Sequence, residues 1–218
     1  MPTLEVFADV GCPFAHVGLR LARQRRDELG LAGEWMWVRA WPLELVNGKP
    51  QDPETVLLHI ADLREQIDPG LFANFDPSVF PATTLPALSL AAQAYREDLA
   101  LGEVTSFALR VALFEEGRDI SRRDVLTEIA KRVGLSNVAI CDDDHLVFDE
   151  WEEGQRRGVE GSPHFFCKGM DSFCPSLDIS REEHGKTRIR LDRARLDRFL
   201  AACFVEGEDG LEAGHAPT

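Results

Sequence analysis

The chain has 218 residues, of which 44% are hydrophobic and 28% are charged, as is usual for a globular protein. Its 38 acidic residues against 24 basic ones give a formal net charge of -14. Nucleic acid and anionic membrane surfaces are therefore disfavoured as partners, because both would repel the chain.

No apolar run approaches the roughly 20 residues that are needed to cross a bilayer. The first nine residues lack the basic start, apolar stretch and cleavage site of a secretory signal. The sequence thus predicts a cytoplasmic protein. The five cysteines are too sparse and irregular for a disulfide scaffold, so we expect mainly reduced thiols.

The first part of the chain, residues 1–48, predicts a βαβ unit. Residues 3–8 alternate polar and apolar side chains as a strand does, and Pro13 suits the first position of a helix. An apolar stripe follows at helical spacing, and residues 34–40 predict a second strand. The two strands should be parallel, with a right-handed crossover between them.

Residues 49–139 predict an all-helical block, because apolar residues recur there at helical spacing. The expected helices are one opened by Asp52-Pro53, one over about 85–99, one over about 103–116, and one after a capping box from Ser121 to Asp124. Residues 68–86 carry four prolines without periodicity and predict a loop that could lie over a site.

Residues 140–204 predict a helix after Asp142 and then a hairpin around Lys168-Gly169. The two strands of the hairpin are expected within residues 159–167 and 173–179. An amphipathic helix that includes Leu191 should follow. The last segment, residues 205–218, is acidic and glycine-rich, which predicts a disordered tail.

These parts fit one α/β plan, βαβ, an all-helical insertion and αββα, which is the thioredoxin fold interrupted in the middle. Two segments carry a resemblance to a family. Residues 8–15, Ala-Asp-Val-Gly-Cys-Pro-Phe-Ala, resemble the strand, loop and Cys-Pro-x-Cys helix start of DsbA-type oxidoreductases. Residues 158–166, Gly-Val-Glu-Gly-Ser-Pro-His-Phe-Phe, are similar to the loop in which that family has a cis proline.

A further stretch from Pro81 to Tyr95, followed by residues 112–114 and 118–120, resembles a cytoplasmic branch of that family. The branch includes 2-hydroxychromene-2-carboxylate isomerases and kappa-class glutathione transferases. The chain departs from the redox members at Ala15, where they have a second cysteine, so no disulfide can close within the Cys-Pro-Phe-Ala motif.

Cys12 is the expected nucleophile, because a thiol at a helix N-terminus has its pKa lowered by the unpaired N–H groups and the macrodipole. His16 lies one turn later and, if protonated, would favour the thiolate further. The alternatives are a buried cysteine that only packs, and a histidine on the surface or in the core.

The resemblance implies a cis Pro163, which would turn the backbone of Ser162 toward Cys12, so that a substrate could pair with it like an added strand. A trans proline is the alternative. The resemblance also implies that His164 lies near the same cleft. The residues expected to bind the substrate or small thiol are Pro13, Phe14, Ala15, Ser162, Pro163 and His164.

No metal site is expected. Cys167 and Cys174 flank the predicted turn and could be imagined as a disulfide or, with His164 or His16, as zinc ligands, but short paired spacings are absent and packing explains both better. Cys141 and Cys203 are expected to be inert. The acidic run of residues 142–144 is better explained as charge at a helix start than as a cation site.

The leading hypothesis is a thiol-disulfide oxidoreductase in which Cys12 attacks a disulfide and an external small thiol resolves the intermediate. Glutathione or an analogue is then a co-substrate, and no tightly bound cofactor is expected. A kappa-class glutathione-transferase-like or isomerase enzyme that binds a small thiol is the second hypothesis. A noncatalytic binding protein of the same fold is the third. A homodimer is compatible with the sequence.

Overall fold

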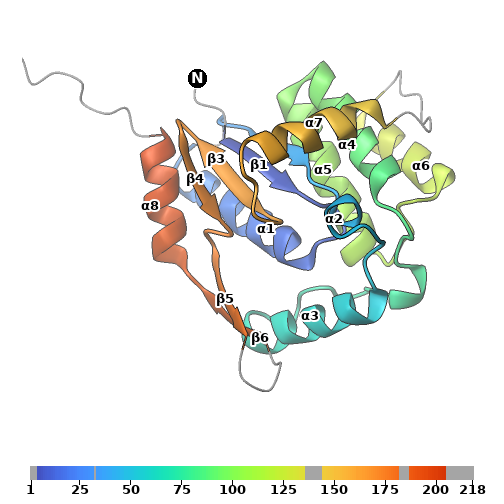
Figure 1. Cartoon of the computed structure of the whole chain (residues 1–218), viewed down its shortest axis with the longest axis horizontal. Coiled ribbons are helices and arrows are strands. Elements are labelled where there is room, and N and C mark those ends of the chain that lie inside the picture. Colours follow the sequence, from blue (N-terminus) through green and yellow to red (C-terminus); the bar gives the residue numbers. More distant parts are fainter. Residues whose placement is uncertain (1–3, 32, 136–143, 182–186, 205–218) are drawn as a thin grey trace, which may run out of the picture.

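A central sheet organises the molecule (Figure 1), and its strand order is β2-β1-β3-β4. This computed structural model describes residues 4–31, 33–135, 144–181 and 187–204. The strands of the sheet are β1 (Leu4–Ala8), β2 (Met36–Ala40), β3 (His164–Cys167) and β4 (Met170–Phe173). The helices are α1 (Pro13–Glu28), α2 (Leu43–Asn47), α3 (Pro53–Gln66), α4 (Leu85–Glu97), α5 (Leu99–Phe114), α6 (Arg123–Val133), α7 (His145–Arg156) and α8 (Arg193–Phe204).

The expected α/β plan is confirmed. Strands β1 and β2 are parallel, with Val6 opposite Val38, and α1 crosses between them. Strand β3 returns antiparallel to β1, with Phe165 opposite Val6, and β4 pairs antiparallel with β3. The helices from α3 to α7 are inserted between β2 and β3, as in a thioredoxin fold with an all-helical insertion.

The sheet is covered on both faces, because alternate residues of each strand point to opposite sides. Val6 and Phe165 belong to the core that α1 and α8 share with one face. Phe7 and Phe166 lie on the other face, where they form a small cluster with Trp41 that Trp151 of α7 covers. Helix α7 can approach closely there because it carries Gly154, whose added Cβ would lie 2.6 Å from the Trp41 ring.

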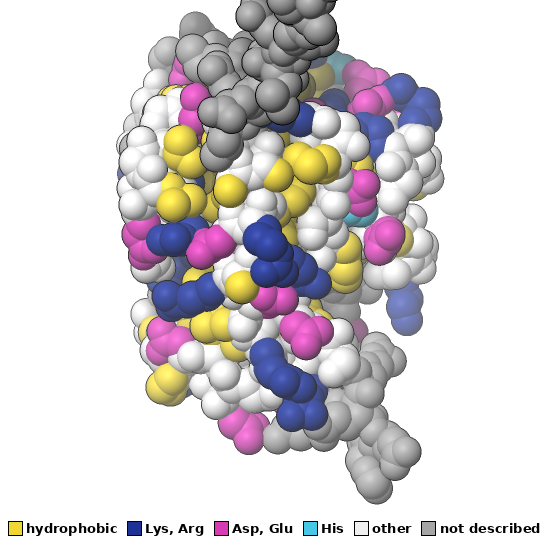
Figure 2. Space-filling model, turned by 90° about the vertical axis from the view of Figure 1, so that its left-hand side faces the viewer, with side chains coloured by type: hydrophobic (Ala, Val, Ile, Leu, Met, Phe, Trp, Pro, Cys, Tyr) yellow, Lys and Arg dark blue, Asp and Glu magenta, His cyan; other side chains and the backbone are white. Residues whose placement is uncertain are grey.

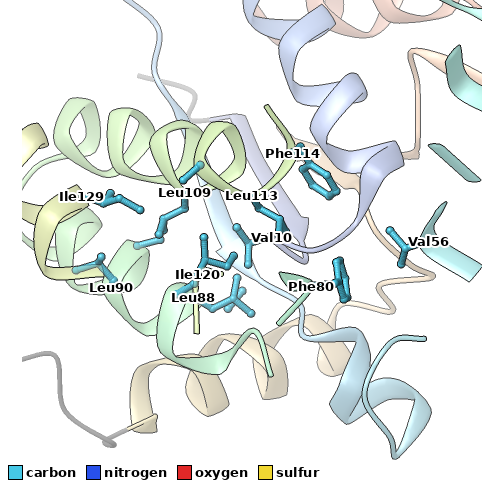
Figure 3. Packing of buried hydrophobic residues seen from close by; sticks show 14 of the residues in the cluster. Val10, Val56, Phe80, Leu88, Leu90, Leu109, Leu113, Phe114, Ile120 and Ile129 are labelled. Atoms are coloured by element: carbon cyan, nitrogen blue, oxygen red, sulfur yellow. The ribbon is translucent and has the colours of Figure 1, made fainter. Parts of the chain in front are cut away.

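The helical insertion has its own core, and the loop after β1 reaches into it. Val10 lies beside Leu113 and Leu88 in this core (Figure 3), although it is only two residues before Cys12. Phe80, from the segment that joins α3 to α4, packs into the same core. The predicted loop of residues 68–86 therefore holds buried aromatic anchors, and it contains a short 3₁₀ helix, Pro77–Val79.

Two buried carboxylates from the insertion bind the free edge of β2. Glu103 of α5 accepts the backbone N–H of Met36 at 2.7 Å, and Glu150 of α7 accepts that of Ala40 at 2.6 Å. Arg26 of α1 donates to Glu103 at 2.8 Å, which pairs the buried charge. These two edge N–H groups of β2 are thus satisfied by side chains, which fix α5 and α7 to the sheet.

The region after β3 differs from the prediction. The hairpin is antiparallel, but its second strand is β4, and residues 173–179 do not form one strand. Strands β5 (Leu177–Arg181) and β6 (Thr187–Leu191) make a separate two-stranded sheet, which leads from the main sheet to α3 (Figure 1). Gln66 of α3 binds it by donating to the carbonyl of Thr187 and accepting from the N–H of Ile189.

Two local predictions are wrong. Helix α6 is capped by Arg122 without a side-chain bond, because the Ser121 hydroxyl donates to Asp119 at 2.6 Å instead of forming a capping box. Leu191 ends β6, so the last helix begins later, at Arg193. The predicted tail of residues 205–218 lies outside the described residues. In the described part of the chain, each helix is too short or too polar to pass through a bilayer.

Candidate functional site

Cys12 is the N-cap residue of α1. Its backbone is extended, with φ -87° and ψ 116°, and its carbonyl accepts the N–H of His16 at 3.0 Å, which starts the helix. Pro13 occupies the first helical turn, where it removes no intrahelical hydrogen bond. The Cys12 side chain thus lies at the positive end of the α1 dipole.

The loop before β3 faces this thiol. The Ser162–Pro163 peptide bond is cis, and the thiol of Cys12 donates to the carbonyl oxygen of Ser162 at 3.2 Å. The Ser162 hydroxyl accepts the backbone N–H of Asp9 at 2.9 Å, so the same residue also binds the end of β1. The structure therefore brings Cys12, Ser162 and Pro163 together.

The prediction of a lowered pKa for Cys12 is wrong. Only 3% of Cys12 is exposed, and this burial raises the pKa of the thiol above its ordinary value. Hydrogen bonds from Ser162 and from the backbone of Ala15 lower the pKa, but burial is the largest effect. The sulfur lies at the N-terminus of α1, and its burial there keeps the pKa of the thiol above its ordinary value.

His16 is buried beside Glu115 and two aromatic rings. Its Nε2 is 2.9 Å from a carboxylate oxygen of Glu115, at the end of α5, and its ring packs against Phe72 and Phe114. Burial lowers the pKa of His16 even though Glu115 opposes this shift, so the neutral form dominates at pH 7. The packing alternative describes this environment, and a catalytic role of His16 stays a prediction.

His164 was expected near the Cys12 cleft, and the structure corrects this. Its side chain lies on the opposite face of the sheet, with its ring 4.5 Å from that of Phe166. Its Nδ1 accepts the backbone N–H of Glu160 at 3.1 Å, and its Nε2 is 3.0 Å from Asp171. The alternation of side chains along β3 explains this, because His164 is on the side of Phe166 and not of Phe165.

The other predicted binding residues, Pro13, Phe14 and Ala15, differ in how exposed their side chains are. Pro13 and Ala15 are buried, and Ala15 belongs to the core beneath the sheet. Phe14 is only partly buried, and its ring lies 5.0 Å from that of His59 on α3. Phe14 is therefore the side chain of the motif that a substrate could touch.

Two functional candidates were missed in the sequence, Asp9 and Arg110. The Asp9 carboxylate accepts the N–H groups of Gly11 at 2.7 Å and Leu43 at 2.6 Å, and complete burial raises its pKa from 3.8 to about 6. The guanidinium of Arg110, from α5, donates to the Asp9 carbonyl at 2.8 Å. A lone arginine within an apolar helix was the available signal.

Comparison with known proteins gives the family. The model of the DsbA-like thioredoxin domain matches residues 3–184, which include both the Cys12 motif and the Pro163 loop. The chain belongs to this DsbA-like family. None of the curated proteins matches the sequence.

Solved structures share the fold of this DsbA-like domain. The cytosolic disulfide reductase DsbM from Pseudomonas aeruginosa is 17% identical, with a TM-score of 0.55, and the match covers 92% of this chain and 97% of DsbM. DsbM has also been solved with GSH. That structure is 16% identical, with a TM-score of 0.55, and the match covers 92% of this chain and 98% of DsbM. A proposed protein disulfide isomerase from Nitrosomonas europaea is 15% identical, with a TM-score of 0.64 and coverage of 92% and 96%.

The remaining described cysteines of this DsbA-like domain, Cys167, Cys174 and Cys203, are buried free thiols. Burial raises the pKa of Cys174 to about 12. The thiols of Cys167 and Cys203 are hydrogen-bonded to each other, which joins β3 to α8. Cys141 lies outside the described residues. Within the described ranges, no three His, Cys, Asp or Glu side chains gather as metal ligands do.

A groove of about 960 Å³ runs along the outer side of α1 in the DsbA-like domain. Val17, Leu21 and Phe107 give it apolar walls, Arg20 and Glu115 line it with charge, and Cys12 does not line it. The neighbouring face over α8 mixes acidic and basic side chains and shows no patch of one sign on its described residues (Figure 2). The hollow surface and the thiol are thus separate features.

Proposed function

We propose that this DsbA-like protein is a thiol-disulfide oxidoreductase that works with one reactive cysteine, Cys12, and an external small thiol. The observation that supports it best is the hydrogen bond of the Cys12 thiol to Ser162 across the cis-proline loop, at the N-terminus of α1. Ala15 provides no second thiol in the motif. Because Ala15 stands where redox members of the family have a second cysteine, a small thiol would have to resolve the mixed disulfide.

The reaction has two exchange steps. The Cys12 thiolate attacks one sulfur of a disulfide, a new S–S bond forms, and the other sulfur leaves as a thiolate that takes up a proton. A small thiol, as its thiolate, then attacks the mixed disulfide and releases the Cys12 thiolate. If the first disulfide is itself mixed with a small thiol, the products are one reduced thiol and one oxidised small thiol, so electrons balance.

The hydrogen bond of the Cys12 thiol affects how a substrate could bind at Ser162. The carbonyl of Ser162, which a substrate strand would use for pairing, is occupied by the Cys12 thiol. Loss of the thiol proton removes this donor and leaves the carbonyl free to pair. Cys12 is thus the proposed nucleophile, and Phe14, Ser162 and Pro163 are the proposed binding residues, with Pro13 setting the helix start.

Glutathione or an analogue is the proposed small thiol, and a cytoplasmic location is part of the same proposal. The fold shared with DsbM, a cytosolic disulfide reductase that has been solved with GSH, supports both. A homodimer stays a prediction, which light scattering of the purified chain tests. Partners that carry a phosphate backbone or an anionic lipid surface are not proposed, because the net charge is -14.

A second candidate is a glutathione-transferase-like or isomerase enzyme, and the raised pKa of Cys12 favours it. A thiol that stays protonated at pH 7 can donate a hydrogen bond to a bound thiolate and need not react itself. Replacement of Cys12 by serine would then preserve the function, because a hydroxyl also donates.

The experiment compares the wild-type chain with Cys12→Ser. After incubation with oxidised glutathione, peptide mass spectrometry is expected to find one glutathionyl group on Cys12. Reduction of a small glutathione mixed disulfide by excess glutathione should be catalysed by the wild type and lost in Cys12→Ser. If Cys12 stays unmodified and Cys12→Ser still conjugates glutathione to a small electrophile, the second candidate is correct. Without either turnover, the protein is a noncatalytic binding protein.

A further inference from the structure

Arg110 is the largest side chain that the described structure buries completely, with 1% of it exposed. Its Nη1 donates to the carbonyl oxygen of Asp9 at 2.8 Å, and that oxygen also accepts the backbone N–H of Cys12 at 3.3 Å. One acceptor therefore joins the guanidinium on α5 to the residue that carries the thiol.

The burial of this charge is only partly compensated. The Nε of Arg110 is buried without a hydrogen-bond partner among the described residues, and burial lowers the pKa of Arg110 to about 10. Cys12 and Asp9 are the two groups that raise the pKa of Arg110 most. A buried charge of this kind is costly unless an opposite charge forms beside it, and Cys12 and Asp9 are the groups that can supply one.

We propose that Arg110 is a positioning residue for Cys12: its guanidinium holds the loop through the Asp9 carbonyl and supplies the positive charge against which the thiolate forms, while the Asp9 carboxylate competes for that charge. This inference rests on the proposed function, because it assigns the electrostatics of the same thiol. It concerns a property of Cys12 that is measured without turnover.

Cys12 is influenced by two charges of opposite sign, those of Asp9 and Arg110. Asp9 raises the pKa of Cys12 and Arg110 lowers it, so the two act with opposite sign on one thiol. The other titratable groups that face these three residues are His16 on α1, Glu44 on α2, Tyr95 on α4 and Cys174 after β4. Burial raises the pKa of Tyr95 and of Cys174 and lowers that of His16, so all three are neutral near pH 7.

The test is the pH dependence of alkylation at Cys12, followed by peptide mass spectrometry in the folded chain. Arg110→Met should raise the pKa of Cys12 and slow alkylation at pH 7 about tenfold, which corresponds to about one pH unit. Asp9→Asn should shift the pKa in the opposite direction by a similar amount. Arg110→Lys keeps the charge and should restore most of the rate.

Arg26→Met is the matched control. Arg26 is also a buried arginine, at 2% exposure, but it is paired with Glu103 at the edge of β2. Its loss should reduce stability and leave the pKa of Cys12 unchanged. A shift in this variant equal to that of Arg110→Met would overturn the proposal, because the effect would then follow from loosened packing.

The outcomes separate the inference from the proposed function. Opposite shifts without any disulfide exchange would support the role of Arg110 and refute the exchange activity. If exchange is catalysed but the pKa of Cys12 is the same in all variants, the exchange activity is supported and the role of Arg110 is refuted. If Arg110→Met does not fold, Arg110→Lys and Asp9→Asn decide, and an alkylation rate in Asp9→Asn that does not exceed the wild-type rate overturns the inference.

Discussion

The carboxylate of Glu150 accepts the backbone N–H of Ala40 at 2.6 Å, which ties α7 to the outer edge of β2. Glu150 is buried at 8% exposure, and burial raises its pKa from 4.5 to about 7. The native protein therefore holds a proton on Glu150 over a pH range in which the unfolded chain has lost it.

This predicts that Glu150 makes stability depend on pH. Its contribution is greatest below pH 4.5, where both states are protonated, and is lost as the pH rises toward 7, because the native carboxyl resists ionisation. The full effect is of the order of 3 kcal/mol. Urea unfolding measures this. Between pH 5 and pH 8, the free energy of unfolding should decrease more for the wild type than for Glu150→Gln. Equal decreases would contradict the prediction.

Gly102→Ala is expected to destabilise the protein. Gly to Ala within a helix usually gains up to about 1 kcal/mol. At Gly102 of α5, however, an added Cβ would lie 2.1 Å from the ring of Tyr95, whose hydroxyl donates to the Met36 carbonyl. Overpacking costs about 1–3 kcal/mol, so the net change should be a loss. Gly33→Ala is the control, because an added Cβ there would have no atom within 4 Å, and it should change stability little. Gly134→Ala is unsuitable, because the φ of 88° at Gly134 would strain an alanine.

Glu103→Gln should cost about 3 kcal/mol, because it removes the buried carboxylate that pairs with Arg26 and leaves only the half-exposed Asp27 beside that guanidinium. The exposed pair Arg122 and Asp124 provides the comparison, since both side chains are more than half exposed. Asp124→Asn should cost less than about 1 kcal/mol. Chemical denaturation of the two variants measures the contrast, and similar losses would argue against the buried pair as a fixing contact.

The folded protein should react slowly at Cys12. Because burial raises the pKa of this thiol, its alkylation by iodoacetamide at pH 7 should be slower than in the urea-unfolded chain, and the rate should continue to rise above pH 9. Peptide mass spectrometry distinguishes Cys12 from the other thiols. A rate that reaches its maximum below pH 7 would show instead that the helix dipole outweighs burial.

The order of elements and the two loops of the site could be predicted from sequence, because strand alternation, Pro13 and the Pro163 segment are local signals. The environment of the thiol could not. Whether Cys12 meets water depends on residues distant in the chain, such as Ser162 and the helices of the insertion. The surroundings of His16 could not be predicted for the same reason, since its partner Glu115 is 99 positions away.

Errors in the second half have a similar physical cause. Residues 173–179 are mainly apolar, but Cys174 donates its backbone N–H to the carbonyl of Pro163 and Leu177 donates to that of Cys174, so the chain turns between β4 and β5. Pro175 was the local signal of this turn, because proline interrupts a strand. Arg110 was overlooked because its buried position depends on tertiary packing of α5 against the loop after β1.

Val10 gives the nucleophile's loop a mechanical link to the rest of the molecule. Its side chain is inserted among Leu88 and Leu113 (Figure 3), while Cys12 begins α1 only two residues later. A displacement of the helical insertion would move Val10, and because Cys12 is only two residues away it would also shift the sulfur. The position of Cys12 is consequently coupled to the packing of helices that lie outside the sheet.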